Sequence, residues 1–553
     1  METKRALLAI VISFAILFGY QYFFPGLDQP VQTTSETQTT VNGTSAKQAG
    51  AIQEITAPVI PVVASAKYDR VPRDIVVDTD LYTATISEAG GALKSFVLKE
   101  QKETNAEDSP GMQLVNNSKT DGYPLTFSWG GAAPSNLLYT SQDSEVRFGS
   151  NGKARLIMTA KSSTGLVIER VYTFDKKTYL FDLDVRVVNQ SGQALQGSAQ
   201  LHQVSVPYES TEDNPAARFL FMGPVVYADG ELTEIDPKDL EDGPQSFMGD
   251  IQWLGYESRY FMSMIVPYGL DGQTFTTSGG ADLTKSFIAG GLDTLAAGAE
   301  KEYKYHVLYG PKKVEMLKSA GYDLDKAVNF GWFDIIAKPT LWLLNFFHSF
   351  THNYGIAIIL VTIMFKGIFW PITQKGMKSM KNMQKLQPKM AALKEKHKDD
   401  PTRMNKEVMS LYKAYKVNPL GGCLPMVLQI PVFFALYKVL LLSIELRHAP
   451  FMFWITDLSA PDRLWIGFNL PYLGGLPVLT LLMGASMFLQ QKFSPTTADP
   501  TQAKIMMFLP VVFTFMFLNF ASGLVLYWFV NNLLSILQQV LINRDVKHKT
   551  ATA

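Results

Sequence analysis

Apolar and polar positions follow different patterns along this chain, and the changes of pattern divide it into parts. Residues 1–24 place Lys4 and Arg5 before a long apolar run that ends in a cluster of aromatic residues. No small-x-small cleavage site follows this run closely, and the nearest, Ala64-Ser65-Ala66, comes about forty residues later. A cleaved signal peptide is the alternative, but the pattern favours an uncleaved transmembrane anchor whose basic N-terminus lies in the cytoplasm.

Residues 25–66 show no hydrophobic periodicity and consist mainly of Thr, Gln, Ser, Ala and Val, which predicts a flexible linker. From residue 67 to residue 325, apolar and polar residues alternate in short segments such as Tyr179–Val188, with polar turns between them. Many short alternating segments at this spacing predict an antiparallel β-sandwich. The sequence of this part offers no metal cluster, nucleophile motif or glycine-rich phosphate loop, so we interpret it as a non-catalytic folding or docking scaffold.

Residues 326–352 change to a helical period and combine an apolar face with a polar one. Asp334, Lys338, Asn345 and His348 share the polar face. The apolar face is rich in aromatic residues. This pattern predicts an amphipathic helix lying in the membrane interface, and a buried helix of a soluble domain is the alternative.

Five long apolar segments follow within residues 353–545, and we expect each to cross the membrane: Tyr354–Trp370, Gly422–Ile444, Leu470–Leu489, Ile505–Phe520 and Leu524–Ile542. Residues 373–419 carry twelve Lys or Arg against four Asp or Glu, which places them in the cytoplasm by the positive-inside rule. Residues 490–504 form a second cytoplasmic loop, and residues 546–553 form a basic C-terminal tail. Six spans with both termini in the cytoplasm leave the β domain in the periplasm.

The predicted fold class is therefore a multi-domain membrane protein. It has an N-terminal transmembrane anchor, a periplasmic antiparallel β-sandwich domain, and a five-helix α-helical transmembrane core with a cytoplasmic helical hairpin. Over all 553 residues the formal net charge is +0, so the distribution of charge is informative and its total is not. The only cysteine, Cys423, excludes an internal disulfide, so the β domain must be stabilised by its own core.

One charge, Lys366, lies inside the first of the five core spans. A lysine deep in a span costs about 2.5–3.5 kcal/mol on insertion scales, so it normally faces a cavity or a partner, with snorkelling toward the cytoplasm as the alternative. Thr362 lies one turn earlier on the same face. The other spans supply polar side chains for a hydrophilic groove: Gln429, Thr514, Asn519, Asn531, Asn532, Ser535, Gln538 and Gln539. By their spacing, Asn532, Ser535 and Gln539 share one helical face.

The length of one predicted span also fits a path for a hydrophilic segment across the membrane. Ile505–Phe520 gives about 24 Å of helix, less than the ~30 Å hydrocarbon core, and a short helical hairpin thins the bilayer locally. A tilted bundle with different helix ends is the alternative.

In residues 373–419, two stripes rich in methionine and tyrosine flank Asp399-Asp400-Pro401, which predicts a helical hairpin. Its methionine-rich side suits varied apolar partners, and its basic side suits ribosomal RNA or anionic lipid.

Four motifs closely resemble the YidC family of membrane-protein insertases: Asn418–Pro425, Gln429–Pro431, Ser494–Thr497 and Ser522–Tyr527. The resemblance covers nearly the whole chain. It implies a five-helix core whose hydrophilic groove opens to the cytoplasm and to lipid but is closed to the periplasm. By the same resemblance, Lys366 is the positive residue of the groove, Thr362 lies in it, and Trp528 is an aromatic residue that meets the substrate. Asp399 and Asp499 fall in two cytoplasmic regions where targeting factors dock.

The resemblance implies an insertase and chaperone that is not an enzyme and works without cofactor, metal or nucleotide. Its implied partners are nascent membrane-protein substrates, the SecYEG translocon, the ribosome, the signal recognition particle and its receptor, and membrane lipids. Burial of the substrate's apolar segment supplies the driving force. The family commonly has arginine where this chain has Lys366. Because lysine cannot bind a carboxylate in the bidentate way, we predict that the groove requires charge rather than fork geometry.

Two other classes of function are weighed against this one. A transporter or channel would predict paired internal repeats and charges along a complete path across the membrane. An intramembrane enzyme would need a convergent set of catalytic groups. The sequence offers neither, since no histidine lies within a core span and Cys423 stands alone. Solute flux in liposomes would separate a transporter from an insertase.

Overall fold

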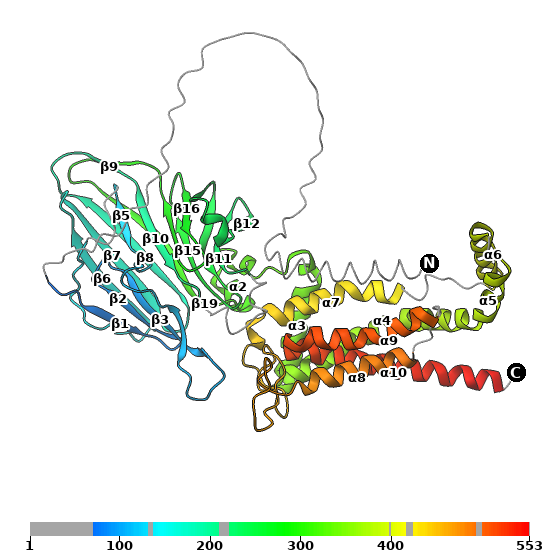
Figure 1. Ribbon diagram of the computed structural model, residues 1–553. Helices are drawn as coiled ribbons and strands as arrows, with labels where there is room; N and C mark the ends of the chain where they lie inside the picture. Colours follow the sequence, from blue (N-terminus) through cyan, green and yellow to red (C-terminus); the bar gives the residue numbers. More distant parts are fainter. Residues whose placement is uncertain are drawn as a thin grey trace, which may run out of the picture. The chain divides into compact units, whose positions relative to one another are not determined.

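The structure is a computed structural model that describes residues 70–130, 137–208, 221–397, 400–415, 424–493 and 500–551. The predicted anchor (residues 1–24) and linker (residues 25–66) lie outside these residues, as do Asp399, Asp499 and most of the motif before Leu424. Among the described residues, β-sheets occupy the part up to Pro311, and helices occupy the part from Val314 onward (Figure 1).

The largest sheet has eight strands, each pairing antiparallel with its neighbours. Side chains of β6 are alternately exposed and buried, as expected for a strand with one face toward a core. Distant segments meet here, since Leu183 of β8 lies opposite Tyr305 of β19. In spatial order the strands are β12 (Glu231–Glu234), β11 (Gly223–Ala228), β14 (Ile251–Glu257), β15 (Phe261–Tyr268), β19 (Glu300–Pro311), β8 (Leu180–Asn189), β7 (Leu166–Asp175) and β6 (Lys153–Lys161).

Three smaller sheets complete the β domain, and their strand pairs are antiparallel too. The first contains β1 (Asp74–Asp78), β2 (Tyr82–Ser87), β3 (Leu93–Lys102) and β4 (Gly111–Val115). The second contains β13 (Gln245–Met248), β16 (Thr274–Gly279), β17 (Thr284–Ala289), β10 (Ala199–Ser205) and β5 (Phe127–Trp129). The third pairs β18 (Asp293–Leu295) with β9 (Leu195–Gly197), and the short helix η3 (Pro237–Leu240) follows β12. The prediction of antiparallel β-sheets is confirmed.

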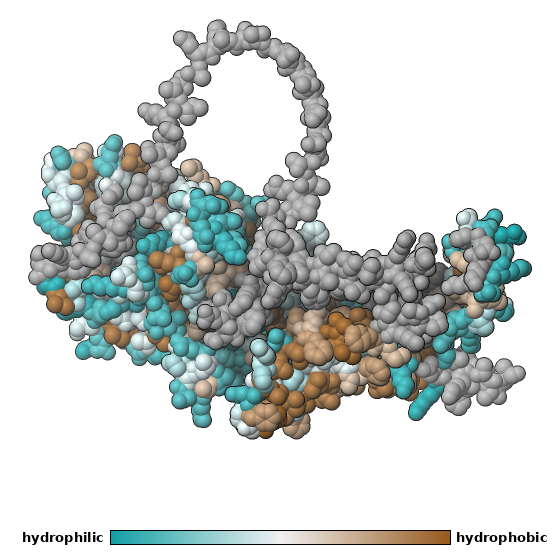
Figure 2. Space-filling model, viewed as in Figure 1, coloured by the Kyte–Doolittle hydropathy of each residue, from teal (hydrophilic) through white to brown (hydrophobic). Residues whose placement is uncertain are grey.

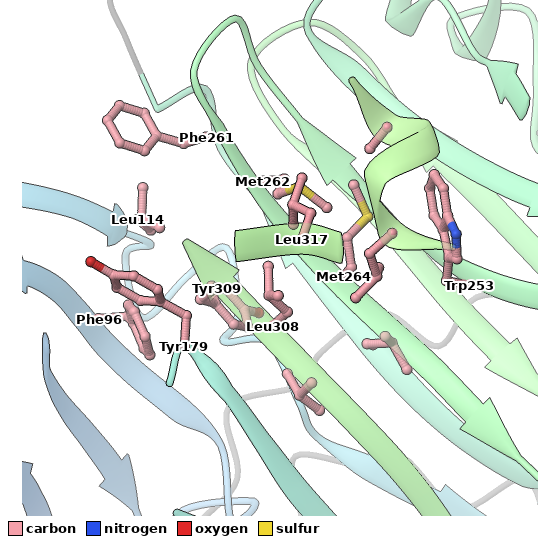
Figure 3. Close-up of a cluster of buried hydrophobic side chains, with 14 of the residues drawn as sticks. Phe96, Leu114, Tyr179, Trp253, Phe261, Met262, Met264, Leu308, Tyr309 and Leu317 are labelled. Atoms are coloured by element: carbon pink, nitrogen blue, oxygen red, sulfur yellow. The ribbon is translucent and has the colours of Figure 1, made fainter. Parts of the chain in front are cut away.

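Aromatic, leucine and methionine side chains pack together in the core of the β domain (Figure 3). The rings of Phe96 on β3 and Tyr309 on β19 are both fully or nearly fully buried, with their centroids 5.3 Å apart. The helix α2 (Val314–Ala320) is attached to this core by Leu317, which lies beside Leu308 of β19 (Figure 3). One side of α2 is thereby fixed to the large sheet.

Each of the five apolar segments overlaps one long helix: α4 (Tyr354–Lys385), α7 (Leu424–Leu442), α8 (Val478–Phe493), α9 (Pro500–Met516) and α10 (Ser522–Ala551). Among the described residues, α4 and Ser522–Ile542 of α10 are long and apolar enough to cross a membrane, while Gln429–Leu442 and Met506–Asn519 are shorter apolar helices. The prediction of a helical C-terminal region is confirmed. The six-span topology stays a prediction.

Several helix ends differ from those expected. α8 begins at Val478 rather than near Leu470, because the chain before it turns back and pairs Leu464 with Leu476 in a short β-bridge. α4 and α10 both run well past their apolar segments. Two short 3₁₀ helices also occur here: η7 (Ile444–Leu446) follows α7, and η8 (Phe517–Asn519) lies between α9 and α10.

The helix α3 (Asp334–Thr351) precedes this group and follows two 3₁₀ turns, η4 (Leu324–Ala327) and η5 (Gly331–Phe333). It packs against α4 and α7 with a buried face that includes Ala337, Leu341 and Leu344. Its opposite face exposes large aromatic side chains: Trp342, Phe346 and Phe350. The helix is therefore amphipathic, and its place in the membrane interface stays a prediction.

The loop predicted to be cytoplasmic contains two helices, α5 (Gln387–Lys396) and α6 (Pro401–Ala414), which pack against each other. The Tyr412 hydroxyl on α6 lies 3.3 Å from the Met390 sulfur on α5. The two stripes rich in methionine and tyrosine thus meet. Because α4 runs to Lys385, the first part of residues 373–419 continues α4 rather than belonging to this hairpin.

Candidate functional site

The charge inside the helical region is Lys366, on α4, and its side chain is only 6% exposed. Its ammonium group donates a hydrogen bond of 2.7 Å to the Ser535 hydroxyl and one of 3.3 Å to the Asn531 side-chain oxygen. Ser535 and Asn531 are one turn apart on α10, and the Ser535 hydroxyl donates in turn to the Asn531 backbone carbonyl at 2.7 Å. The lysine is therefore held between α4 and α10.

The partners of Lys366 are all neutral. No carboxylate of a described residue lies within 4.0 Å of its ammonium group. Neutral oxygens replace part of the hydration that the ammonium loses, but they do not balance its charge. The site is therefore a buried lysine without a carboxylate counter-charge among the described residues.

Three further polar side chains of α10 contact two neighbouring helices. Toward α4, the Gln538 amide donates at 2.8 Å to the Thr373 hydroxyl. Toward α8, the Asn532 amide donates at 3.0 Å to the Ser486 hydroxyl, and the Gln539 amide donates at 2.8 Å to the Phe493 carbonyl. The structure thus separates Ser535, which contacts α4, from Asn532 and Gln539, which contact α8.

The other residues predicted to line the groove lie on α4, α7 and α9. Thr362 is buried on α4, one turn before Lys366, and its hydroxyl donates to the Ile358 carbonyl at 2.6 Å. The Thr514 hydroxyl on α9 donates to the Pro510 carbonyl at 2.7 Å. A Cβ added at Gly484 of α8 would lie 2.0 Å from this hydroxyl, so α8 and α9 approach closely at Thr514. Gln429 is half-buried near the start of α7.

Trp528 belongs to an aromatic cluster rather than to the polar set. Its ring is half-buried and meets Phe433 of α7 edge to face, with centroids 4.8 Å apart. The centroid of the Trp528 ring also lies 5.0 Å from that of the Phe517 ring in η8. These contacts join α7, η8 and α10. Asp399 and Asp499 lie outside the described residues, so their docking role stays a prediction.

Sequence reasoning missed two residues that complete the network. Thr373 lies seven residues after Lys366 and therefore on the same face of α4, a spacing from which it could have been found. Ser486 lies in an apolar, glycine-containing segment and carries no comparable signal. Among the described residues, no group of three or more His, Cys, Asp or Glu side chains is placed to hold a metal ion.

The outer surface of the helices is apolar. Figure 2 shows hydrophobic side chains gathered over the helical part of the molecule. Large exposed side chains occur on each of α4, α8, α9 and α10: Ile363, Ile368, Leu481, Phe488, Phe508, Phe515 and Leu537. Exposed apolar surface next to a buried polar interior is the arrangement expected of helices in a lipid bilayer.

Comparison with known proteins finds sequence matches along nearly the whole chain. Residues 346–550 match the family model described as 60Kd inner membrane protein, and residues 74–343 match the model of the YidC periplasmic domain. The membrane protein insertase YidC of Pelobacter propionicus is 43% identical, covering 98% of this chain and 99% of the relative. That of Citrifermentans bemidjiense is 42% identical with the same coverage.

A solved structure described as an active YidC insertase with its first transmembrane domain resolved covers 85% of this chain and 92% of its own, at 19% identity and a TM-score of 0.35. A score at that level carries no argument, and the assignment rests on the sequence matches. Relatives above 40% identity match from end to end, and the two family models cover the β domain and the helical region separately. The chain therefore belongs to the YidC family of membrane protein insertases, and it is an inner-membrane protein with a periplasmic domain.

Proposed function

We propose that this insertase draws the polar, acidic tail of a nascent membrane protein into its helical core with the charge of Lys366. The observation that carries the proposal is that the buried ammonium is held only by neutral oxygens of α10, without a described carboxylate within 4.0 Å. A carboxylate on the incoming tail would supply the missing counter-charge. Thr362, Gln429, Thr514, Asn532, Ser535 and Gln539 provide the polar surroundings of the path, and Trp528 contacts the apolar part of the substrate.

Insertion in this scheme needs no covalent chemistry. The tail exchanges water for the polar side chains between α4 and α10, so the apolar distance that it crosses is shortened. The apolar segment that follows then moves along the lipid-facing sides of the helices. Burial of apolar surface at about 25 cal/mol per Å² provides the driving force for release into the bilayer.

The proposal includes a topology and a set of partners. Six spans place both termini and the hairpin of α5 and α6 in the cytoplasm, where the basic surface of the hairpin meets the ribosome. Asp399 and Asp499 lie in the two loops that dock the signal recognition particle and its receptor. The insertase acts alone on small substrates and beside the SecYEG translocon on larger ones.

Replacement of Lys366 tests the role of its charge. In vesicles, Lys366→Ala is expected to reduce insertion of a substrate with a short acidic tail by about tenfold or more, since a charge-assisted hydrogen bond contributes about 1.5–3 kcal/mol. A matched substrate with a neutral tail should lose much less. Lys366→Arg should retain activity, because the proposal requires charge and not a particular geometry.

A second lysine provides the control. Lys438 also lies in an apolar helix, α7, and Lys438→Ala removes the same charge away from Ser535 and Asn531. It should leave insertion of the acidic-tailed substrate unchanged. Full activity of Lys366→Ala would contradict the proposal, and equal losses for acidic and neutral tails would show that Lys366 has a structural role only.

A further inference from the structure

A second polar site lies where the β domain, α2 and the start of α4 come together. A partly open cavity of about 640 Å³ occupies this place. This volume falls within the range of about 300–1,000 Å³ that is typical of small-molecule sites. Its lining includes Lys177 from the turn before β8, Lys313 and Glu315 at the start of α2, Tyr354 at the start of α4, and Glu445 in η7. The cavity shares none of these residues with the Lys366 site.

Charges of both signs line this cavity without neutralising each other directly. The charged side chains of the lining are Lys177, Lys313, Glu100, Glu315 and Glu445. None of them forms an ion pair within 4.0 Å with a described residue, although ten such pairs occur elsewhere in the described chain. Glu445 is half-buried; its carboxylate accepts a hydrogen bond from the Asn345 side chain and is attracted by Lys313, but no cation of a described residue lies within 4.0 Å of it. A ligand that carries a cation and an anion close together would match this lining.

The lining also has an apolar side and borders the helix proposed to lie in the membrane interface. Leu180 and Met316 contribute apolar surface to the cavity. The Tyr354 hydroxyl donates to the Asn345 side chain of α3 at 3.1 Å, and the Tyr354 ring stacks on His348 of α3 with centroids 3.8 Å apart. α3 exposes a row of aromatic side chains on its other face, in which Trp342 stacks on Phe346 and Phe346 meets Phe350 edge to face, as interfacial segments do. A lipid headgroup is thus the nearest source of a zwitterionic ligand.

We propose that this cavity binds the headgroup of a zwitterionic phospholipid of the phosphatidylethanolamine type. Lys177 and Lys313 bind the phosphate, and Glu315 and Glu445 bind the ammonium. The glycerol and the first carbons of the acyl chains contact Leu180 and Met316. Carboxylates in the lining disfavour lipids whose headgroup carries only negative charge, so the site selects phosphatidylethanolamine over phosphatidylglycerol. The bound lipid joins the β domain to the first turn of α4.

Native mass spectrometry of the full-length chain released from detergent measures this binding directly. Phosphatidylethanolamine, phosphatidylglycerol and free phosphoethanolamine are titrated separately. The unmodified chain should bind phosphatidylethanolamine at least about tenfold more tightly than phosphatidylglycerol, since a charge-assisted contact corresponds to a ten- to hundredfold change in affinity. Free phosphoethanolamine should not displace the lipid at equal concentration, because it lacks the apolar contacts.

Matched variants assign the binding to the cavity. Lys177→Ala with Lys313→Ala should weaken phosphatidylethanolamine binding about tenfold or more, whereas Lys318→Ala with Lys326→Ala, an equal change of charge at exposed positions outside the lining, should not. Lys177 lies in an exposed turn, so the single variant Lys177→Ala preserves the fold and should show the same direction of change. Glu315→Gln with Glu445→Gln should abolish the preference over phosphatidylglycerol.

The outcomes separate this proposal from that for Lys366. Lys366→Ala should bind phosphatidylethanolamine as the unmodified chain does, whatever its insertion activity. Unchanged affinity in the Lys177 and Lys313 variants, or equal binding of the two lipids by the unmodified chain, would overturn the proposal. Displacement by free phosphoethanolamine at equal concentration would identify the ligand as a soluble solute instead of a lipid and would overturn it as well.

Discussion

Buried charges in this chain are stabilised in two ways. Lys366 and Arg170 have only neutral hydrogen-bond acceptors: Arg170, fully buried in the β domain, donates to the carbonyls of Gly90, at 2.9 Å, and Leu125. Glu88 is different, because its fully buried carboxylate is paired with Arg70 at 2.5 Å and with Arg73. Burial raises the pKa of Glu88, but hydrogen bonds from both arginines outweigh burial and lower that pKa to about 2.

Glu88 should therefore make the stability of the β domain depend on pH in a defined interval. Because its folded-state pKa lies below the ordinary value of 4.5, Glu88 contributes stability above about pH 4.5 that is lost as the pH falls toward 2. Glu88→Gln should lower the free energy of unfolding by about 3 kcal/mol at pH 6 and flatten its decline between pH 4.5 and 2. Denaturant unfolding at a series of pH values measures both effects. The exposed-site variant Asp80→Asn should change neither, and a Glu88→Gln curve parallel to that of the unmodified chain would contradict the prediction.

At the residue scale, the sequence predicted the site in part. Lys366 stands out because a charge in an apolar segment is costly wherever the helix packs, and Thr362 follows from helical spacing. The contact of Lys366 with Ser535 was not predictable in the same way. It depends on which faces of α4 and α10 meet, and that is set by the packing of the whole helical group rather than by either segment.

Helix ends in this chain are set by contacts with distant loops. The side chain of Asp462, nearly fully buried, accepts the backbone N–H groups of Leu479 at 2.5 Å and Thr480 at 3.1 Å, the first turn of α8. Its other oxygen accepts the Trp454 indole N–H at 2.5 Å. Val478 lies sixteen positions after Asp462. An apolar run that begins at Leu470 gives no sign of such a cap, so the sequence placed the start of this helix too early.

The cap predicts a specific effect of substitution. Asp462→Ala leaves two helix N–H groups and one indole N–H without their acceptor, and should lower the free energy of unfolding by about 1–3 kcal/mol. Asp462→Asn keeps one acceptor oxygen and should lose less than half as much. Thermal unfolding of the purified chain in detergent compares the two. An alanine variant as stable as the asparagine variant would mean that water satisfies these groups and that Asp462 does not determine where α8 begins.

For the whole molecule, two arginines join the β domain to the helices. Arg259, in the turn between β14 and β15, donates at 2.6 Å to the carbonyl of Leu441 in the last turn of α7. Arg447, after η7, donates to the carbonyls of Lys102 at 2.7 Å and Glu103 at 3.1 Å, at the end of β3. Each arginine thus reaches from one part to backbone atoms of the other.

Loss of Arg447 should loosen the loop between β3 and β4. Because Arg447→Ala removes two charge-assisted hydrogen bonds to that loop, amide hydrogen exchange in residues 99–111 should become about tenfold faster or more. Exchange measured by mass spectrometry on the full chain gives the rate for each peptide. Arg155→Ala, at an exposed position on β6, should leave the same peptide unchanged. Equal exchange in the Arg447→Ala chain would show that the carbonyls of Lys102 and Glu103 need no such restraint.

The sequence predicted which segments form strands and which form helices, but not how these elements are arranged. Alternation with a period of two predicted antiparallel strands, and long apolar runs predicted helices, because both are local properties of the chain. The order of the strands within the sheets was not predictable, because β5 pairs with β10 and β8 pairs with β19, and these segments are distant in sequence. The contacts of Arg259 and Arg447 between the β domain and the helices could not be predicted from the sequence for the same reason.

The length of α4 has a thermodynamic consequence. Its 32 residues extend about 48 Å, well beyond a ~30 Å hydrocarbon core. The proposed lipid cavity lies at its first residue, Tyr354. The proposed attractor of substrate tails is Lys366, and the hairpin of α5 and α6, for which we propose a docking role, begins two residues after Lys385. Where this helix moves as one body, a ligand that binds one tilt of the helix more tightly changes the affinities of the other two sites for their ligands. By reciprocity, a ligand bound at either of the other sites changes the affinity for the first ligand by the same factor. Lipid composition, recruitment of the nascent chain and capture of its tail are then linked equilibria, and none can be tuned alone.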